Sequence, residues 1–186
     1  MSIRRVMIVL LCEDTQHEIF VRRFLKGLGW NTRDIRVNKS PSAGGSAEQW
    51  VRMQFPAELM HYRQRKNKAA SALIVMIDAD NKKSQERILE FKDECKAKNI
   101  HFRADDEAVA IAVPKRNIET WIHFLMGEAV DEENAFSRLE RERGCKPAVD
   151  VLVGRCRSTG LPRDAPRSLT AACDEYNSRI KEMSWR

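Results

Sequence analysis

Two aspartates separated by a single residue, Asp78 and Asp80, have the types and spacing best suited to metal chemistry in this sequence. They follow an apolar run, Leu73 to Ile77, whose lack of polar alternation predicts a strand buried on both faces of a parallel sheet. Residues i and i+2 of an extended chain point to the same side, so both carboxylates could present oxygens to one point. Two like charges this close favour a hard divalent cation between them. The alternative is that one aspartate caps the following helix and the other is solvated.

Glu13 and Glu119 are two further acidic candidates, one at the end of a predicted strand and one at the start of a predicted helix. Glu13 comes directly after a second apolar run, Val6 to Leu11 and Cys12. Glu119 lies in the first turn of a helix that we predict to begin after Asn117, where a carboxylate also stabilises the helix dipole without doing any chemistry. Lys115, just before this helix, is either a surface charge or a contact to phosphate.

A basic run ends the long helical pattern predicted over Ser46 to Lys68. Its members are Arg63, Arg65, Lys66 and Lys68. Such a run is usually a solvated helix face, but it directly precedes the Asp78 strand and could contact phosphates. The formal net charge of +6 is compatible with a polyanionic partner without requiring one.

Composition sets the broad class. With 186 residues and 42% hydrophobic residues, the chain suits one α/β domain with a small helical extension. Its five cysteines are an odd number, far apart and without metal-ligand spacing, which favours a reducing compartment. The apolar run near the N-terminus is too short for a signal peptide, and no stretch approaches the length of a spanning helix. We therefore expect a soluble, cytoplasmic protein with no membrane partner.

Strand-like and helix-like segments alternate along most of the chain, which predicts an α/β fold with a mainly parallel sheet. Glu13 and the aspartate pair should then meet, because the carboxyl ends of parallel strands lie at one edge of the sheet. Pro56 should kink its helix or begin a second one. Two shorter strands are predicted over Asp34 to Asn38 and Ala108 to Val113, and a possible edge strand over Ile100 to Arg103. A polar loop is predicted over Lys39 to Ser46. The further helices are predicted over Gln16 to Leu28, Ser84 to Lys96, Asp131 to Arg143, Lys146 to Cys156 and Leu169 to Met183.

The order of these motifs resembles the Toprim domain of topoisomerases, primases and overcoming-lysogenization-defect nucleases, and most of all the small stand-alone, RloB-like group of Toprim-like proteins. Glu13-Asp14-Thr15-Gln16-His17 with Phe20 is similar to the first motif of that group, Asp78-Ala79-Asp80 to the second, and Pro114 with Glu119-Thr120-Trp121 to the third. The resemblance covers about residues 4 to 126. It implies a Toprim-like (Rossmann-like) domain over residues 1–126 and a C-terminal helical extension over 127–186 that packs on the same domain.

The resemblance further implies a nuclease dependent on Mg²⁺ or Mn²⁺, acting on DNA or RNA in prokaryotic defence or mobile elements. Glu13, Asp78, Asp80 and Glu119 would be metal ligands or catalytic groups, with Lys115 balancing charge. Two departures, Asp14 in place of a glycine and His17 in place of an acid, leave open whether the second metal position is intact. The alternatives are a binding or regulatory module without catalysis, acting as subunit of a larger protein complex, and nucleotidyl transfer like that of primases.

Overall fold

The fold is α/β, with a four-stranded sheet in which every strand is parallel to its neighbours. A computed structural model describes residues 5–41 and 46–185. The strands are β1 (Met7–Cys12), β2 (Ile35–Lys39), β3 (Ser71–Met76) and β4 (Val109–Ala112), in the order β2-β1-β3-β4. The parallel sheet flanked by helices that we predicted is confirmed, and it has a Rossmann-like arrangement.

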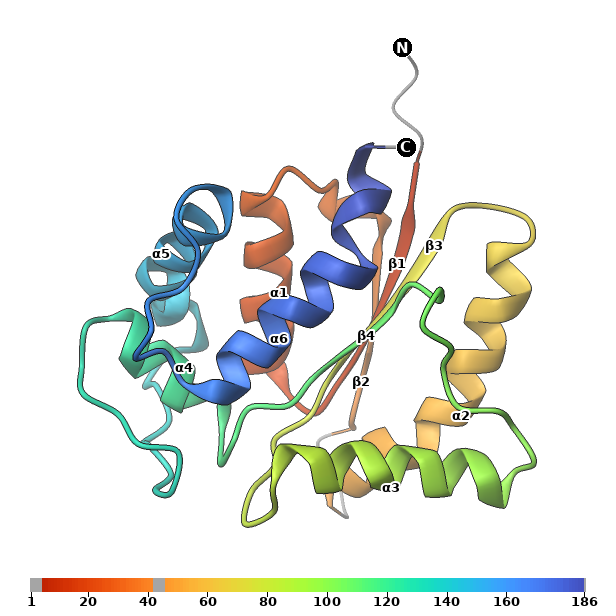
Figure 1. Ribbon diagram of the computed structural model, residues 1–186, viewed down its shortest axis with the longest axis horizontal. Coiled ribbons are helices and arrows are strands. Elements are labelled where there is room, and N and C mark those ends of the chain that lie inside the picture. The colour runs from red at the N-terminus through yellow and green to blue at the C-terminus, as the bar shows by residue number, and fades with distance from the viewer. Residues whose placement is uncertain (1–4, 42–45, 186) are drawn as a thin grey trace.

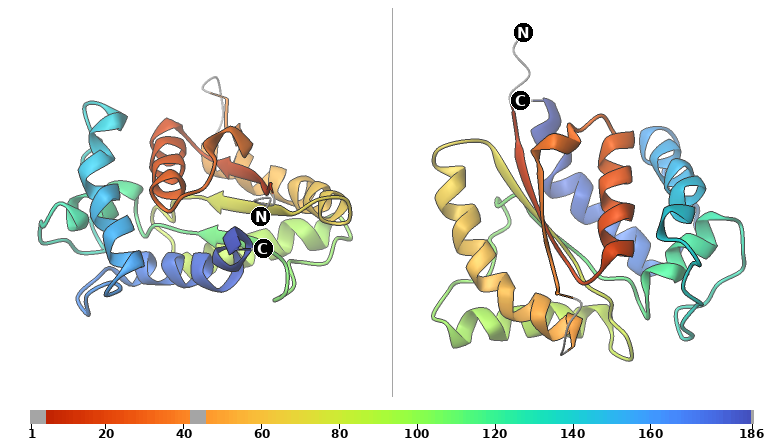
Figure 2. Two further views of the ribbon diagram at one scale, coloured as in Figure 1. Left: turned by 90° about the horizontal axis from the view of Figure 1, so that it is seen from above. Right: turned by 180° about the vertical axis from the view of Figure 1, so that it is seen from behind.

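Helices cover both faces of this sheet (Figure 1). α1 (Thr15–Gly27) and α6 (Arg167–Arg179) lie on one face, and α2 (Ala47–Lys66) and α3 (Ser84–Ala97) on the other. α4 (Ile118–Leu125) and α5 (Lys146–Arg157) extend the first layer, with α5 beside α1 in both views of Figure 2. Residues 128–185 thus contribute α5 and α6, which pack against α1 and β4. Among the described residues, no helix combines the length and the apolar character needed to cross a membrane.

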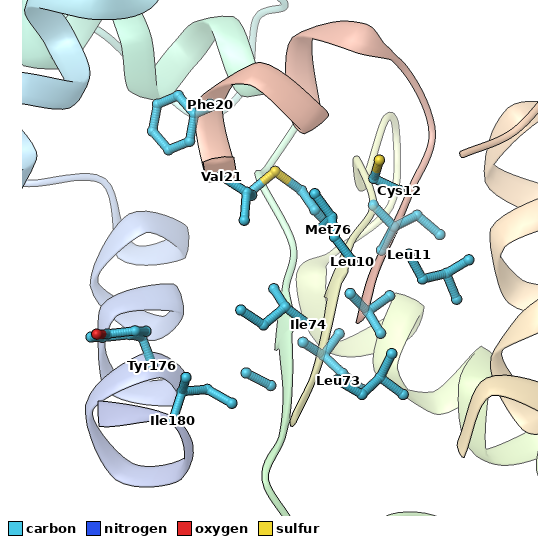
Figure 3. Packing of buried hydrophobic residues seen from close by; sticks show 14 of the residues in the cluster. Leu10, Leu11, Cys12, Phe20, Val21, Leu73, Ile74, Met76, Tyr176 and Ile180 are labelled. Carbon is cyan, nitrogen blue, oxygen red and sulfur yellow. The ribbon is translucent and has the colours of Figure 1, made fainter. Parts of the chain in front are cut away.

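The core lies between the sheet and its helices. Every residue of β3 is buried, as expected for a strand covered on both faces. Figure 3 shows Ile74 and Met76 of β3 on the side of α1 and α6, where Phe20, Val21 and Tyr176 also lie. Phe55 and Phe91, from α2 and α3, pack together on the other face with ring centroids 4.7 Å apart. This packing fixes the helices against the sheet and so fixes the loops at its carboxyl end.

The outer edge of β4 is held by side chains instead of by another strand. Glu175 of α6 accepts a hydrogen bond of 2.9 Å from the backbone N–H of Ile111. Arg103 donates to the carbonyl of Val109 at 2.6 Å and to both carboxylate oxygens of Glu175. Because these groups bind backbone positions on the edge of β4 that no strand pairs with, α6 is tied to β4 by polar contacts as well as by packing.

Two sequence-based predictions of local structure are wrong. The segment from Asp131 to Arg143 is irregular as far as a short 3-10 helix, Glu142–Cys145, because the Asp131 carboxylate binds the backbone N–H groups of Glu133 and Asn134 in a local turn. The predicted edge strand over residues 100–103 is absent from the described chain, since Arg63 takes two of its carbonyl groups. Of the two outcomes predicted for Pro56, a second helix does not begin there, because α2 is one helix from Ala47 to Lys66. Of the polar loop predicted over Lys39 to Ser46, residues 42–45 lie outside the described residues.

Candidate metal centre at the carboxyl end of the sheet

Glu13, His17 and Asp78 form the most compact group of potential metal ligands in the described chain. One ligand atom from each residue lies within 4.8 Å of the other two. The sheet register explains two of them: Cys12 of β1 is paired with Met76 of β3, so the chain segments carrying Glu13 and Asp78 leave neighbouring strands side by side. The predicted convergence of these two acids is therefore present at the lower end of the sheet in Figure 1.

His17 joins the group from the first turn of α1. The Asp14 side chain caps this helix by accepting a hydrogen bond of 2.9 Å from the backbone N–H of His17. The imidazole is fully buried, and its Nε2 lies 3.1 Å from Oδ1 of Asp78. Its Nδ1 is also buried and has no hydrogen-bond partner in the described chain. A buried imidazole with one unpartnered nitrogen is unusual enough to call for a functional reason.

Burial and mutual charge shift the protonation of this group. Burial raises the pKa of Glu13 to about 7, with the Asp78 charge adding to the rise and the charge of His17 opposing it. Burial would lower the pKa of His17, but the charge and hydrogen bond of Asp78 outweigh it and raise the pKa to about 9. Without a bound cation, His17 therefore carries the positive charge that compensates the carboxylates near neutral pH.

The same donor set suits a divalent cation. Two carboxylates and one imidazole are ligands that metal ions use in proteins, and Glu13 and Asp78 are only partly buried. Glu13 Oε1 also accepts a hydrogen bond of 2.5 Å from the backbone N–H of Asp78, which orients its carboxylate. These residues could therefore hold a metal ion.

Asp80 is held apart from this group. Its backbone is left-handed, with φ of 52°, so the alternation of side chains in a strand no longer applies after β3 has ended. Its carboxylate accepts a hydrogen bond of 2.9 Å from the guanidinium of Arg87, and its side chain is 56% exposed. Burial and the charge of Asp78 nevertheless raise the pKa of Asp80. The two aspartates therefore do not act as one matched pair, although both line a hollow beside the three-residue group.

Glu119 lies beside the group and is 5% exposed. Burial raises its pKa, and the charges of Asp78 and Asp14 add to the rise, whereas a hydrogen bond from its own backbone N–H opposes it. It lines two adjoining hollows of about 220 Å³ each, together with Asp14 and Arg138. The charge of Asp78 thus affects the pKa of Glu119, but Glu119 is not a member of the compact group formed by Glu13, His17 and Asp78.

The basic side chains that the sequence suggested as phosphate contacts lie in two different places. Lys115 is 3.4 Å from the carboxylate of Glu133 and does not line either hollow, whereas its neighbour Arg116 and the distant Arg138 do. The basic run lies at the end of α2, next to the start of β3 and so at the opposite end of the sheet from Asp78. Two of its members bind Glu107: Arg63 through two hydrogen bonds of 2.8 and 2.9 Å, and Lys66 at 3.3 Å. Arg65 lies 4.0 Å from Glu58, and Lys68 is exposed.

Sequence reasoning missed His17 as a member of the site. It stands where the resembling motif has an acid, so the motif by itself indicates only a departure from the pattern at this position. The available signal was its position three residues after the helix cap Asp14, in the turn that faces the carboxyl end of β1. Comparisons of the chain with protein-family models, with curated proteins and with solved structures found no match.

Proposed function

We propose that the protein is a divalent-metal-dependent nuclease that hydrolyses phosphodiester bonds of DNA or RNA. The observation that carries the proposal is the group formed by Glu13, His17 and Asp78, with ligand atoms within 4.8 Å of one another at the carboxyl end of a parallel sheet. Open α/β sheets bind their ligands at this edge. The Toprim-like order of motifs agrees with this chemistry, and a role in prokaryotic defence or mobile elements belongs to the same proposal.

We assign Glu13, His17 and Asp78 as the ligands, and we favour Mn²⁺ over Mg²⁺. Mg²⁺ prefers oxygen ligands in near-ideal octahedral geometry, whereas an imidazole suits transition metals better. When bound, such a cation polarises a phosphoryl oxygen and makes a water molecule more acidic. Glu119, kept close to Asp78 in a buried position, is the carboxylate available to accept a proton beside the site.

The test combines metal binding with cleavage. Titration calorimetry with MnCl₂ should show binding to the wild type that is lost in Asp78→Ala and weakened in His17→Gln. The matched control is Asp93→Asn, because Asp93 is an exposed carboxylate on α3 that lies outside the site. Labelled single- and double-stranded DNA and RNA should be cleaved by the wild type with Mn²⁺, and not by Asp78→Ala or in EDTA. Cleavage that persists in Asp78→Ala would disprove the assignment.

A second candidate is a non-catalytic binding or regulatory subunit of a larger nucleic-acid-processing complex. The observation that favours it is the internal pairing of the group: His17 Nε2 lies 3.1 Å from Asp78, and Glu13 already accepts the Asp78 backbone N–H. These contacts satisfy the charges without any ion. Nucleic-acid binding with no Mn²⁺ binding and no cleavage of any substrate would establish this candidate instead.

A further inference from the structure

The hollow beside the candidate metal centre is lined by side chains of both charges. It measures about 220 Å³, and its lining includes the carboxylates of Asp14, Asp78, Asp80 and Glu119 together with the guanidinium-bearing residues Arg116 and Arg138. A second hollow of similar volume adjoins it and shares Asp14, Glu119 and Arg138. Carboxylates can hold a cation, and guanidinium groups in the same lining can hold the anion on which that cation acts.

Neither arginine forms an ion pair with a carboxylate in the part of the chain that the structure describes. Arg116 donates to the amide oxygen of Asn81, and its Nε is buried without a partner. Arg138 is exposed and makes no hydrogen bond to another described residue. Arg87, by contrast, binds the carboxylates of Glu48, Glu90 and Asp80. Arginines that line a hollow among carboxylates without binding them keep their donors available for an anion.

The backbone holds Arg116 in place at a conformational cost. Its φ is 69°, a left-handed conformation that residues other than glycine rarely adopt. Asp80 is also left-handed, and its backbone N–H donates to the Arg116 carbonyl at 3.1 Å, so two left-handed residues that line the hollow are bonded directly to each other. Strain of this kind is retained mainly where it serves a function.

Arg138 is positioned from a different part of the chain. Two residues before it, the backbone of Phe136 makes two hydrogen bonds with the Asn117 side chain, at 2.8 and 3.3 Å. On its other side, Gln16 donates to the carbonyl of Glu142 at 3.2 Å. The irregular segment that carries Arg138 is therefore anchored at both ends beside the start of α4 and the start of α1.

We propose that Arg116 and Arg138 bind the phosphate group of the substrate opposite the metal centre. A guanidinium presents a rigid fork of donors that matches phosphate oxygens, and it does so better than the lysine expected from the sequence. Each hollow is smaller than the roughly 300 Å³ at which ordinary small-molecule pockets begin, so it suits a phosphate with part of its sugar better than a whole nucleotide.

The lining of both hollows contains no aromatic side chain among the described residues. Base stacking on aromatic rings is the usual source of base contacts to single strands. The site therefore reads the sugar-phosphate backbone and not the bases. This inference deepens the proposed nuclease function and rests on it for the identity of the substrate as a phosphate ester of nucleic acid.

The test measures binding of a fluorescent thymidine 12-mer with CaCl₂ present, for wild type, Arg116→Ala, Arg116→Lys, Arg138→Ala and the control Arg141→Ala. Arg141 is an exposed arginine three residues from Arg138 that does not line either hollow. We expect each alanine variant to lose about tenfold in affinity and to lower the slope of log K against log salt by about 1, while Arg141→Ala binds like the wild type. Adenine and RNA 12-mers should bind equally well. Arg116→Lys, which keeps the charge but not the planar fork of donors, should bind between the wild type and Arg116→Ala. Unchanged affinity in both alanine variants would overturn the proposal.

Two further arms separate the possible failures. Inorganic phosphate and thymidine monophosphate are added as competitors, and competition as strong as that of the 12-mer would show a small phosphate ester as ligand in place of nucleic acid. Mn²⁺ binding is measured on the same variants and should be unchanged. If no protein binds Mn²⁺ or cleaves, but 12-mer binding still depends on both arginines, the phosphate site stands and the nuclease function fails.

Discussion

The ion pair between Glu107 and Arg63, at the end of the sheet opposite the candidate metal centre, gives a prediction of stability whose magnitude follows from the structure. Glu107 is 4% exposed and accepts two hydrogen bonds from Arg63, one from Lys66 and one from the backbone N–H of Ala104. Burial alone would raise the pKa of Glu107, but the hydrogen bonds from Arg63 and Ala104 outweigh it and lower the pKa to about 2. The charged carboxylate therefore stabilises the folded state.

The change from the ordinary value of 4.5 to about 2 corresponds to ~3.4 kcal/mol at about 1.36 kcal/mol per pKa unit. Arg63 is partly open to solvent, which screens the pair, so we expect about 2 kcal/mol. Because the folded pKa is depressed, this stabilisation is complete above about pH 4.5 and is lost as the pH falls toward about 2. Glu107→Gln imitates the protonated form and lacks this stabilisation at every pH.

The assay is urea unfolding of wild type and Glu107→Gln at about pH 7, about pH 4 and about pH 2.5. The free energy of unfolding of the variant should lie about 2 kcal/mol below that of the wild type at neutral pH, and the difference should shrink as the pH falls. Asp106→Asn is the control, because Asp106 is exposed and forms no ion pair in residues 5–41 and 46–185. A difference that is absent at neutral pH, or that is equally large at all three values, would refute the reasoning.

Three further predictions concern stability elsewhere in the molecule. Glu175→Ala should lower the free energy of unfolding in urea by about 3 kcal/mol, because Arg103 loses its carboxylate partner and the Ile111 N–H loses its acceptor; a decrease below about 1 kcal/mol would contradict this. Gly27→Ala should lower the free energy of unfolding by about 1 to 3 kcal/mol, because a Cβ would lie 2.6 Å from Val153 Cγ2. Gly154→Ala has open space at its Cβ and should raise the free energy of unfolding by about 0.5 kcal/mol. Arg116→Gly should raise the free energy of unfolding by about 1 kcal/mol, because glycine adopts the positive φ without strain, and it should weaken 12-mer binding; a fall in both quantities would count against strain at this position.

The parts of the molecule that sequence could predict are those governed by local pattern. Unbroken apolar runs identified β1, β3 and β4, and the geometry of parallel sheets then brought Glu13 and Asp78 together. The spacing rule for strands could not place Asp80, because it holds only while the chain is extended, and here a left-handed residue follows the end of β3.

The remaining differences depend on contacts between distant residues. His17 and Asp78, which pair with each other, are 61 positions apart in the sequence. Arg63 and Glu107, which form an ion pair, are 44 positions apart. An apolar stripe over residues 131–143 predicted a helix, but the Asn117 side chain binds the Phe136 backbone and holds the segment open. A pattern within one segment contains no information about partners that are distant in the sequence.

The hold of Glu175 and Arg103 on the outer edge of β4 also bears on how the protein behaves in concentrated solution. An uncovered edge strand offers free N–H and C=O groups to the same strand of another molecule, and this is a common route to aggregation. Here the Ile111 N–H and the Val109 carbonyl are already bound within the chain. At the opposite edge, β2 has the sequence Ile-Arg-Val-Asn-Lys, whose two charged side chains discourage a second molecule from pairing there. Removing α6 would therefore do more than shorten the protein: it would open a template for intermolecular sheet growth.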